Sequence, residues 1–276
     1  MGNLLRVDFF RLWRSKSFWA CMIFQVGSAL FFPIMNYIRG IKNGFSIVPD
    51  WNLFAGIAFI CVLSALFSTL FVGTDYSDGT IRNQLVVGHH RWEIYLSHLF
   101  TCITGCLLMC AGYLLPYLAV GTPLFGPLET DMGTVLAYLG ATLVLTVALA
   151  SVYTMLAMLI PNRAVSAVVA LVLSFTLLIS GSYLYSYLNY PPTYTQVTYN
   201  SVSGELEEQE SPSPFYLKGT KRDVFQLLCD VTPGGQIMQC VGWDAPNLPL
   251  LPVYSAALTV VTTGAGLWGF RRKDLN

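Results

Sequence analysis

The sequence predicts an all-α membrane protein with six transmembrane helices in a single transmembrane domain over residues 1–276. Hydrophobic residues make up 54% of the chain and charged residues only 11%, whereas an average soluble domain carries about 25% charged residues. The mean hydropathy is +0.57. Because so few charges cannot cover a water-facing surface, the composition excludes a soluble globular protein, a disordered chain and a coiled coil.

Six apolar runs are the second observation behind this prediction. Each is long enough to cross a hydrocarbon core of about 30 Å, which takes roughly 20 residues. None contains Lys, Arg, Asp or Glu, although an amphipathic helix of a soluble protein carries charges along one face. The predicted spans are approximately 18–38, 51–72, 94–121, 132–160, 164–188 and 249–270.

The basic residues predict how these spans are oriented. Ten of the 15 basic residues lie in the two tails and in segments 73–93 and 161–163, and five lie in the other loops. Since cytoplasmic loops carry the excess of Lys and Arg, we expect both termini in the cytoplasm. Basic and acidic residues are equal in number, 15 of each, so no basic excess indicates nucleic-acid binding.

Residues 1–17 precede the first span and are expected to form a helix that lies along the inner membrane surface. Arg11 and Arg14 lie on its polar face. A frayed tail with anchoring charges is the alternative. No small-residue cleavage site follows the first apolar run, so we expect a retained span and not a cleaved signal peptide. The apolar face of the helix comprises Leu5, Phe9, Leu12 and Trp13.

The cytoplasmic segment 73–93 is longer than a simple connection requires. Ser77 or Asp78 can cap a short helix, with Ile81 and Leu85 on its apolar face and Gly88 at its end. A second helix then starts near His90 and continues into the third span. Such a short helix could dock into a cleft on a cytoplasmic partner. The alternative is an ordered turn that only packs on the helix bundle.

The same segment resembles a known family. Asp75 followed by Gly79-Thr80-Ile81-Arg82-Asn83, then Gly88 and Arg91, then Ile94-Tyr95-Leu96-Ser97 is similar to the loop between the second and third spans of type-2 ABC exporter permeases. The ending, Gly266 with Phe270-Arg-Arg-Lys-Asp-Leu-Asn276, also resembles the tail of that family. Asp75 stands where glutamate is usual, and His98 stands where lysine is usual.

This resemblance implies a bacterial cell-membrane permease subunit whose short loop helix, the coupling helix, contacts a separate ATPase subunit. Two ATPase subunits, which bind ATP and Mg, would work with two permeases, either identical or different, surrounded by membrane lipid. The N-terminal helix corresponds to the connecting helix of the family. The residues in or beside the coupling region are then Asp75, Gly79, Thr80, Ile81, Arg82, Gly88 and Arg91.

The chain itself has no phosphate-binding Gly-x-x-x-x-Gly-Lys-Ser/Thr motif, so we expect neither enzyme activity nor a cofactor of its own. Spans without acids or bases favour export of a hydrophobic or amphipathic compound, such as a peptide antibiotic, a drug or a lipid. No residue identifies the substrate. Two alternatives are an ATPase-independent secondary transporter or channel, which would need titratable groups in its spans, and a membrane-embedded lipid-modifying enzyme.

Two other groups of residues contain side chains that can bind metal ions. His89, His90 and Glu93 lack the third ligand of a helical zinc motif, so no metal site is expected there. Cys102, Cys106 and Cys110 share one face of the third span and are expected to pack against other helices.

Segment 189–248 is the longest polar stretch and is expected outside the cytoplasm. Residues 190–199 look extended, the acidic stretch 201–214 is expected to be mobile, and 222–231 is expected to form a helix that stops at residues 232–235. In this family such a segment can dip into the outer leaflet. Cys229 and Cys240 lie in it and could form a disulfide, because oxidation is possible there.

Overall fold

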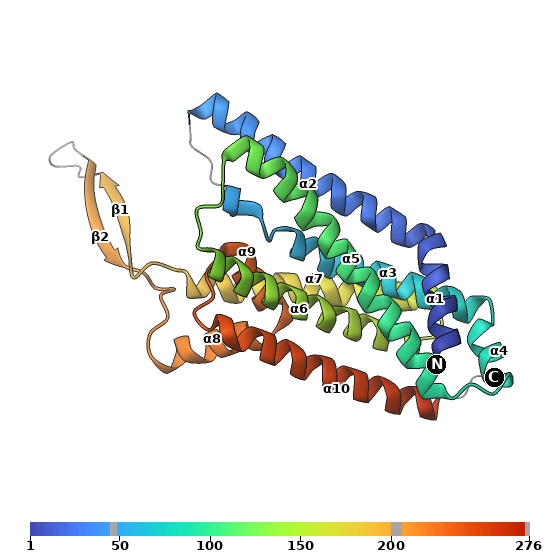
Figure 1. The fold of residues 1–276 in the computed structure, drawn as a ribbon. Helices are drawn as coiled ribbons and strands as arrows, with labels where there is room; N and C mark the ends of the chain where they lie inside the picture. The colour runs from blue at the N-terminus through green and yellow to red at the C-terminus, as the bar shows by residue number, and fades with distance from the viewer. Residues whose placement is uncertain (45–48, 200–205, 274–276) are drawn as a thin grey trace.

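The computed structural model describes residues 1–44, 49–199 and 206–273 (Figure 1). The elements that cross or flank the bundle are α1 (Gly2–Arg14), α2 (Lys16–Asn43), η1 (Pro49–Asn52), α3 (Gly56–Ser77), α4 (Thr80–Val86), α5 (Arg91–Phe125), α6 (Met132–Leu159) and α7 (Arg163–Leu188). After them come β1 (Thr193–Tyr199), β2 (Leu206–Pro212), α8 (Thr220–Val231), α9 (Pro233–Gly242), η2 (Leu248–Leu250) and α10 (Leu251–Arg272).

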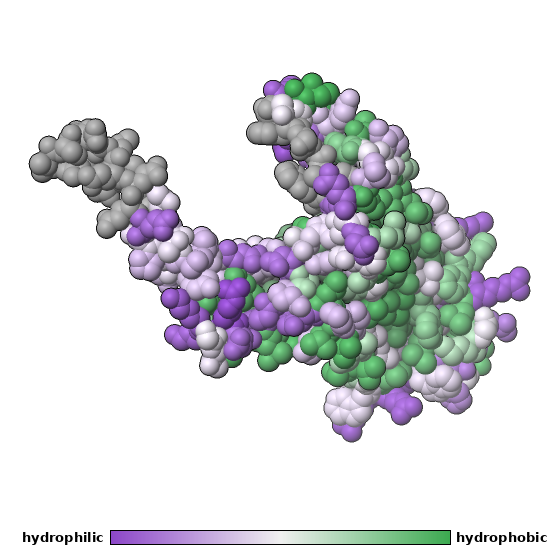
Figure 2. Space-filling view, turned by 60° about the vertical axis from the view of Figure 1, so that its left-hand side comes forward, coloured by the Kyte–Doolittle hydropathy of each residue, from purple (hydrophilic) through white to green (hydrophobic). Residues whose placement is uncertain are grey.

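Six helices of the described chain are long and apolar enough to cross a membrane, which confirms the predicted all-α architecture. They are α2, α3, α5, α6, α7 and α10, the last counted together with η2. Figure 2 shows hydrophobic residues over the body of the bundle and hydrophilic residues at the projecting hairpin and at the opposite edge. This distribution is the one expected of a protein whose middle faces lipid.

The centre of the bundle is α3. In its most apolar stretch 72% of the residues are buried, against 22% in α7 and in α10. It packs against α2, α5, α6 and α7, whereas α10 packs mainly on α6. The buried side chains form two clusters, one toward each end of the helices. We call the end that carries both termini, α1 and α4 the terminal end, and the end that carries β1 and β2 the hairpin end.

Two spans are longer than the sequence indicated. The helix α2 continues to Asn43, and α5 has 35 residues although it contains Pro116 and Pro123. At a rise of 1.5 Å per residue, α5 is about 52 Å long, well beyond the hydrocarbon core. Both helices therefore extend past the body of the bundle toward the hairpin end (Figure 1).

The N-terminal helix forms as predicted, but its buried face is different. The buried residues of α1 are Leu4, Asp8 and Leu12, whereas Trp13 is 54% exposed. Arg11, which was placed on the polar face, reaches inward and forms an ion pair with Asp75. Polar and charged partners on α3 and α5 determine which face of α1 is buried. A prediction of that face from the apolar residues of α1 alone does not include these partners.

At the hairpin end, the extended stretch and the helix of segment 189–248 are present as β1 and α8. The expectation of a mobile acidic stretch was wrong for residues 206–212, which form β2 and pair antiparallel with β1; residues 201–205 lie outside the described chain. The helix α8 ends at Val231, where the sequence predicted a stop, but only Thr232 separates it from the next helix. Thr232 caps α9, and Pro233 occupies the first turn of α9, where the missing N–H of proline costs nothing.

The contact between α7 and α9 depends on glycine. A Cβ atom at residue 234 would overlap the carbonyl oxygen of Leu177, and one at residue 181 would overlap the backbone of Gly234. Gly234→Ala should therefore push α9 away from α7 and destabilise the protein by roughly 1–3 kcal/mol, measured as a lower melting temperature in detergent. Gly140→Ala is the control, because residue 140 of α6 has open space around it. Equal melting temperatures for the two variants would contradict this packing.

Candidate functional site

The short helix α4 lies across the terminal end of the bundle, between α3 and α5 (Figure 1). Gly79 and Gly88 flank it with φ angles of 69° and 101°. Only glycine adopts this left-handed conformation without strain, so these two residues allow the chain to reverse twice within a short segment. The capping differs from the prediction, because α3 continues through Ser77 and Gly79 is the N-terminal cap residue of α4.

The two faces of α4 differ in exposure. Ile81 is buried in the cluster of the terminal end and anchors the helix. Arg82 and Gly88 are exposed, and Val86 and Val87 are 81% and 78% exposed. Exposed valines beside an exposed arginine form an open surface of mixed character, which we call the α4 surface. Such a surface suits contact with another protein better than contact with water alone.

The remaining residues of the predicted coupling region have other surroundings. Thr80 is half-buried, and Asp75 is fully buried in α3, so Asp75 is not part of the α4 surface. Arg91, in the first turn of α5, donates hydrogen bonds to the carbonyl oxygens of Phe270, Arg271 and Lys273 at 3.0, 3.2 and 2.5 Å. Arg91 therefore ties α5 to the C-terminal end of α10, where positively charged side chains are favoured.

Lys273 makes a second tie at the same place. Its Nζ donates to the hydroxyl of Tyr76 at 2.9 Å and to the carbonyl oxygen of Met158 at 2.8 Å. These contacts join the end of α10 to α3 and α6. Burial lowers the pKa of the Lys273 ammonium from 10.5 to about 8, because a partly desolvated cation loses water that it has in the unfolded chain.

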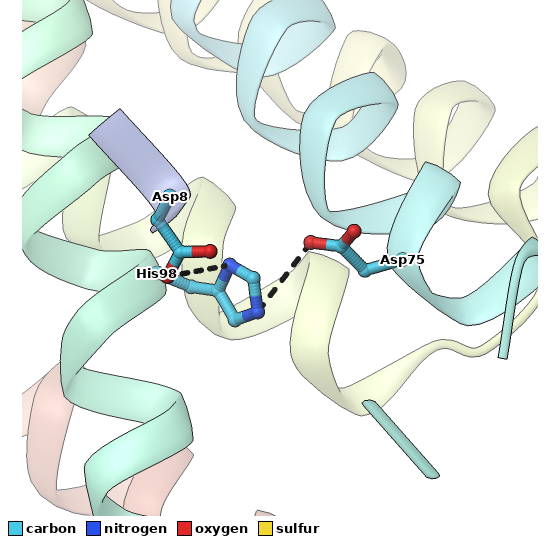
Figure 3. A group of neighbouring side chains, drawn as sticks. All are labelled: Asp8, Asp75 and His98. Carbon is cyan, nitrogen blue, oxygen red and sulfur yellow. Dashed lines mark ion pairs between the residues drawn. The ribbon is translucent and has the colours of Figure 1, made fainter. Parts of the chain in front are cut away.

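Beneath α1, charged side chains from three helices meet in a buried group that we call the polar cluster. It consists of Asp8 and Arg11 of α1, Asp75 of α3 and His98 of α5. Asp8, Asp75 and His98 are each at most 1% exposed. Figure 3 shows the imidazole of His98 between the two carboxylates. Residues 90 positions apart in the chain are thus brought together in the interior of the protein, where a charge needs a partner.

The contacts in the polar cluster are of two kinds. Arg11 forms a close ion pair with Asp75 and a longer one, 3.7 Å, with Asp8, and Ser97 donates to Asp8 at 2.5 Å. His98 Nε2 lies 3.5 Å from Asp75 Oδ2, and Nδ1 lies 3.9 Å from Asp8 Oδ2. These last two separations exceed hydrogen-bond lengths, and neither ring nitrogen has a hydrogen-bond partner.

Electrostatics explains why Arg11 stays in this cluster. Burial by itself would lower the pKa of Arg11, but its hydrogen bond to Asp75 and the charges of Asp75 and Asp8 outweigh burial and raise the pKa above its ordinary value. The guanidinium is therefore a permanent cation that faces two carboxylates. With a neutral imidazole, the four side chains carry a net charge of −1.

Sequence reasoning did not identify the polar cluster. Asp8 was treated as part of a surface helix, and Asp75 as a residue of the coupling loop. His98 was noted only as a departure from the family motif, although a histidine inside an apolar run is by itself a signal of function. The distant positions 8, 75 and 98 gave no local pattern that could show they meet.

The predicted disulfide is not formed in the structure, where Cys229 and Cys240 are both buried free thiols. Cys229 faces Gln239, and Cys240 faces Thr142 of α6. Burial raises the pKa of the Cys229 thiol to about 11 and that of the Cys240 thiol to about 12. Both side chains are thus used in packing, and neither is present as the reactive thiolate at neutral pH.

Comparison with known proteins adds no identification. No protein-family model matches this chain, and no curated protein matches it.

The lowered pKa of Lys273 can be tested by chemical labelling. Trace acetylation across pH 6–11 should give a midpoint near 8 for Lys273, below the value of about 10.4 of a lysine in an unfolded chain. The unfolded chain binds more protons between these two pH values, so the contribution of Lys273 to stability should rise with pH across this window. The same midpoint for Lys273 in the folded and in the denatured protein would contradict burial of the Lys273 ammonium.

The thiols of Cys229 and Cys240 should resist a water-soluble maleimide in the folded protein at pH 7.5 and react after denaturation. Their raised pKa values and burial both suppress the thiolate. Mass spectrometry of a non-reducing digest gives the result for each residue. A peptide pair joined through Cys229 and Cys240 would instead restore the predicted disulfide.

Proposed function

We propose that this chain is the membrane-spanning permease subunit of an ATP-driven exporter of the type-2 ABC exporter family. The observation that carries the proposal is the α4 surface, formed by exposed Arg82 and Val86 of α4 and by exposed Val87 and Gly88 directly after it, on a short segment held between two spans. On this proposal the α4 surface is cytoplasmic and docks into a partner ATPase, and both termini lie on the same side in the bacterial cell membrane.

The connections of α4 suit the transmission of force. Two residues join it to α3 and four join it to α5, and Ile81 anchors its inner face in the bundle. A push on α4 from a closing ATPase pair therefore moves the ends of both spans. ATP and Mg are bound by the two partner subunits, and this chain with a second permease, identical or different, forms the moving pathway.

The polar cluster also supports the family assignment. Asp75 and His98 are the two positions at which the chain departs from the usual glutamate and lysine of the motif. In the structure these two side chains face each other, 3.5 Å apart. An acidic side chain thus lies opposite an imidazole at these two positions of the motif.

The proposed substrate class is supported by an apolar hollow in the bundle. A hollow of about 260 Å³ opens between α5 and α6 toward the hairpin end. It has room for an acyl chain or another apolar group, and it supports a hydrophobic or amphipathic substrate. Its lining is formed by Leu53, Phe54, Ala111, Leu114, Leu115, Leu118, Val135, Leu139 and Leu143.

The polar cluster favours a second candidate, an ATPase-independent transporter coupled to protons or cations. Asp75 and His98 lie inside the helices α3 and α5, and titratable groups within spans mark ion pathways. Their position argues for the exporter, however. Asp75 is two residues from the end of α3, and His98 is seven residues from the start of α5, about 10 Å along the helix, so both lie near the membrane edge.

Co-expression decides between the two candidates. The chain is produced together with a candidate Walker-type ATPase, such as one encoded beside its gene, purified by a tag on the permease, and reconstituted into proteoliposomes. The exporter proposal predicts co-purification and transport that needs ATP. Transport of solute by the purified chain alone, driven by an ion gradient without nucleotide, would overturn it.

Arg82→Glu tests the α4 surface directly. A charge reversal on an exposed docking residue should weaken ATPase binding and coupling by about tenfold or more, because like charges across an interface cost several kcal/mol. Membrane insertion and the melting temperature should be unchanged, since Arg82 is exposed. ATPase stimulation in proteoliposomes is the measurement.

Arg39→Glu is the matched control for this variant, because Arg39 is exposed in the part of α2 that extends toward the hairpin end. It makes the same change of charge on the far side of the bundle. Normal coupling in Arg82→Glu, or an equal loss in Arg39→Glu, would refute a docking role for α4.

A further inference from the structure

The geometry of the polar cluster points to a ligand that none of the arguments above requires. One oxygen of Asp8, one oxygen of Asp75 and one ring nitrogen of His98 all lie within 4.8 Å of one another. All three residues are essentially without solvent exposure. Arg11 pairs with Asp8 Oδ1 and Asp75 Oδ1, but Asp75 Oδ2 and both ring nitrogens of His98 have no hydrogen-bond partner. Buried polar atoms normally have one.

The spacing of these atoms fits a metal ion better than it fits hydrogen bonds. Zinc binds histidine nitrogen and carboxylate oxygen at about 2.0–2.2 Å, so two ligands of one tetrahedral ion lie roughly 3.5 Å apart. His98 Nε2 and Asp75 Oδ2 are 3.5 Å apart. Asp8 Oδ2 lies 3.9 Å from the other ring nitrogen, Nδ1, so binding of one ion by all three residues requires a shift of Asp8, and with it of α1, toward the ion.

The donor set narrows the class of ion. Imidazole suits zinc, copper, iron and nickel, whereas calcium and magnesium prefer oxygen ligands alone. One nitrogen and two carboxylates recur in zinc sites that leave a fourth position for water. The hydroxyl of Ser97, which donates to Asp8 at 2.5 Å, supplies the outer hydrogen bond that orients a carboxylate ligand.

Arg11 competes with such an ion for Asp75, with which it forms an ion pair. Its side chain is 26% exposed, so the guanidinium has a route outward to water or lipid headgroups, which the buried ligands do not have. A divalent cation in its place balances the charges of Asp8 and Asp75 completely. With Arg11 inside, one of the two negative charges stays uncompensated, whereas a divalent ion in its place compensates both.

We propose that Asp8, Asp75 and His98 form a binding site for a divalent metal ion of the zinc class, which displaces Arg11 and fastens α1 to α3 and α5. The site does not depend on the exporter assignment, since its ligands and its occupant are defined by the fold alone. Its effect is mechanical, because metal binding fixes the N-terminal helix against the two spans that hold α4.

Metal binding by the full chain in lipid nanodiscs tests the proposal. Wild-type protein should bind one Zn²⁺ in calorimetry. Co²⁺ should give weak visible bands without the strong thiolate band that coordination by the cysteines would produce. Asp75→Asn and His98→Gln should weaken binding by about 100-fold or more, since even loss of an outer-shell partner costs about 10- to 100-fold.

Matched controls separate this site from the surface groups of the terminal end. Asp78→Asn removes an exposed carboxylate, and His89→Gln removes a partly exposed imidazole; neither should change the affinity. Arg11→Gln removes the competing cation and should tighten binding by about tenfold, which corresponds to about 1.4 kcal/mol. A plain network of ion pairs predicts no metal binding in any of these proteins.

If Asp75→Asn or His98→Gln fails to fold, hydrogen exchange of the wild-type protein tests metal binding without any change to the metal-binding residues. Addition of Zn²⁺ to wild-type protein should slow amide exchange across α1 (Gly2–Arg14) and leave α8 unchanged. The proposal is overturned if wild-type protein binds no Zn²⁺ or Co²⁺, if Arg11→Gln weakens binding, or if a folded Asp75→Asn variant keeps the wild-type affinity.

Discussion

The cost of an unpaired charge in hydrocarbon is the constraint on which the rest of this structure depends. A charged group at the centre of a bilayer is expensive unless it faces another polar group, and the long apolar stretches of the six spans accordingly carry none. The charges gather at the two ends of the bundle. Where charged groups are buried, as Asp8 and Asp75 are, they meet Arg11, Ser97 and His98.

This constraint also determines how α1 sits on the bundle. A helix that lies on the membrane surface would ordinarily turn its most apolar face inward. Here Asp8 is buried between Leu4 and Leu12 while Trp13 faces outward, because Asp8 and Arg11 reach partners on α5 and α3. The rotation of α1 is set by the desolvated polar contacts, since leaving any one of them unpaired would cost more than exposing an aromatic side chain.

The elements that could be predicted from the sequence are those that depend on a local pattern of residues. The six spans and α8 follow from apolar runs and helical periodicity, and the segment 73–93 follows from its glycines. Prediction failed where distant residues decide the outcome. The strand β2 forms from an acidic stretch because β1 offers it a partner. The polar cluster joins positions 8, 75 and 98, and Cys229 and Cys240 face different neighbours, which no local pattern reveals.

The ties at the terminal end decide how a push on α4 spreads through the bundle. Asp75 links the last turn of α3 to α1, and Arg91 links the first turn of α5 to the end of α10. Lys273 joins that end to α3 and α6. A displacement of α4 therefore reaches four spans and α1 within one turn of their ends. Because the cluster that holds α1 is buried, salt screens it far less than it screens a surface ion pair, so this linkage keeps its strength at the ionic strength of a cell.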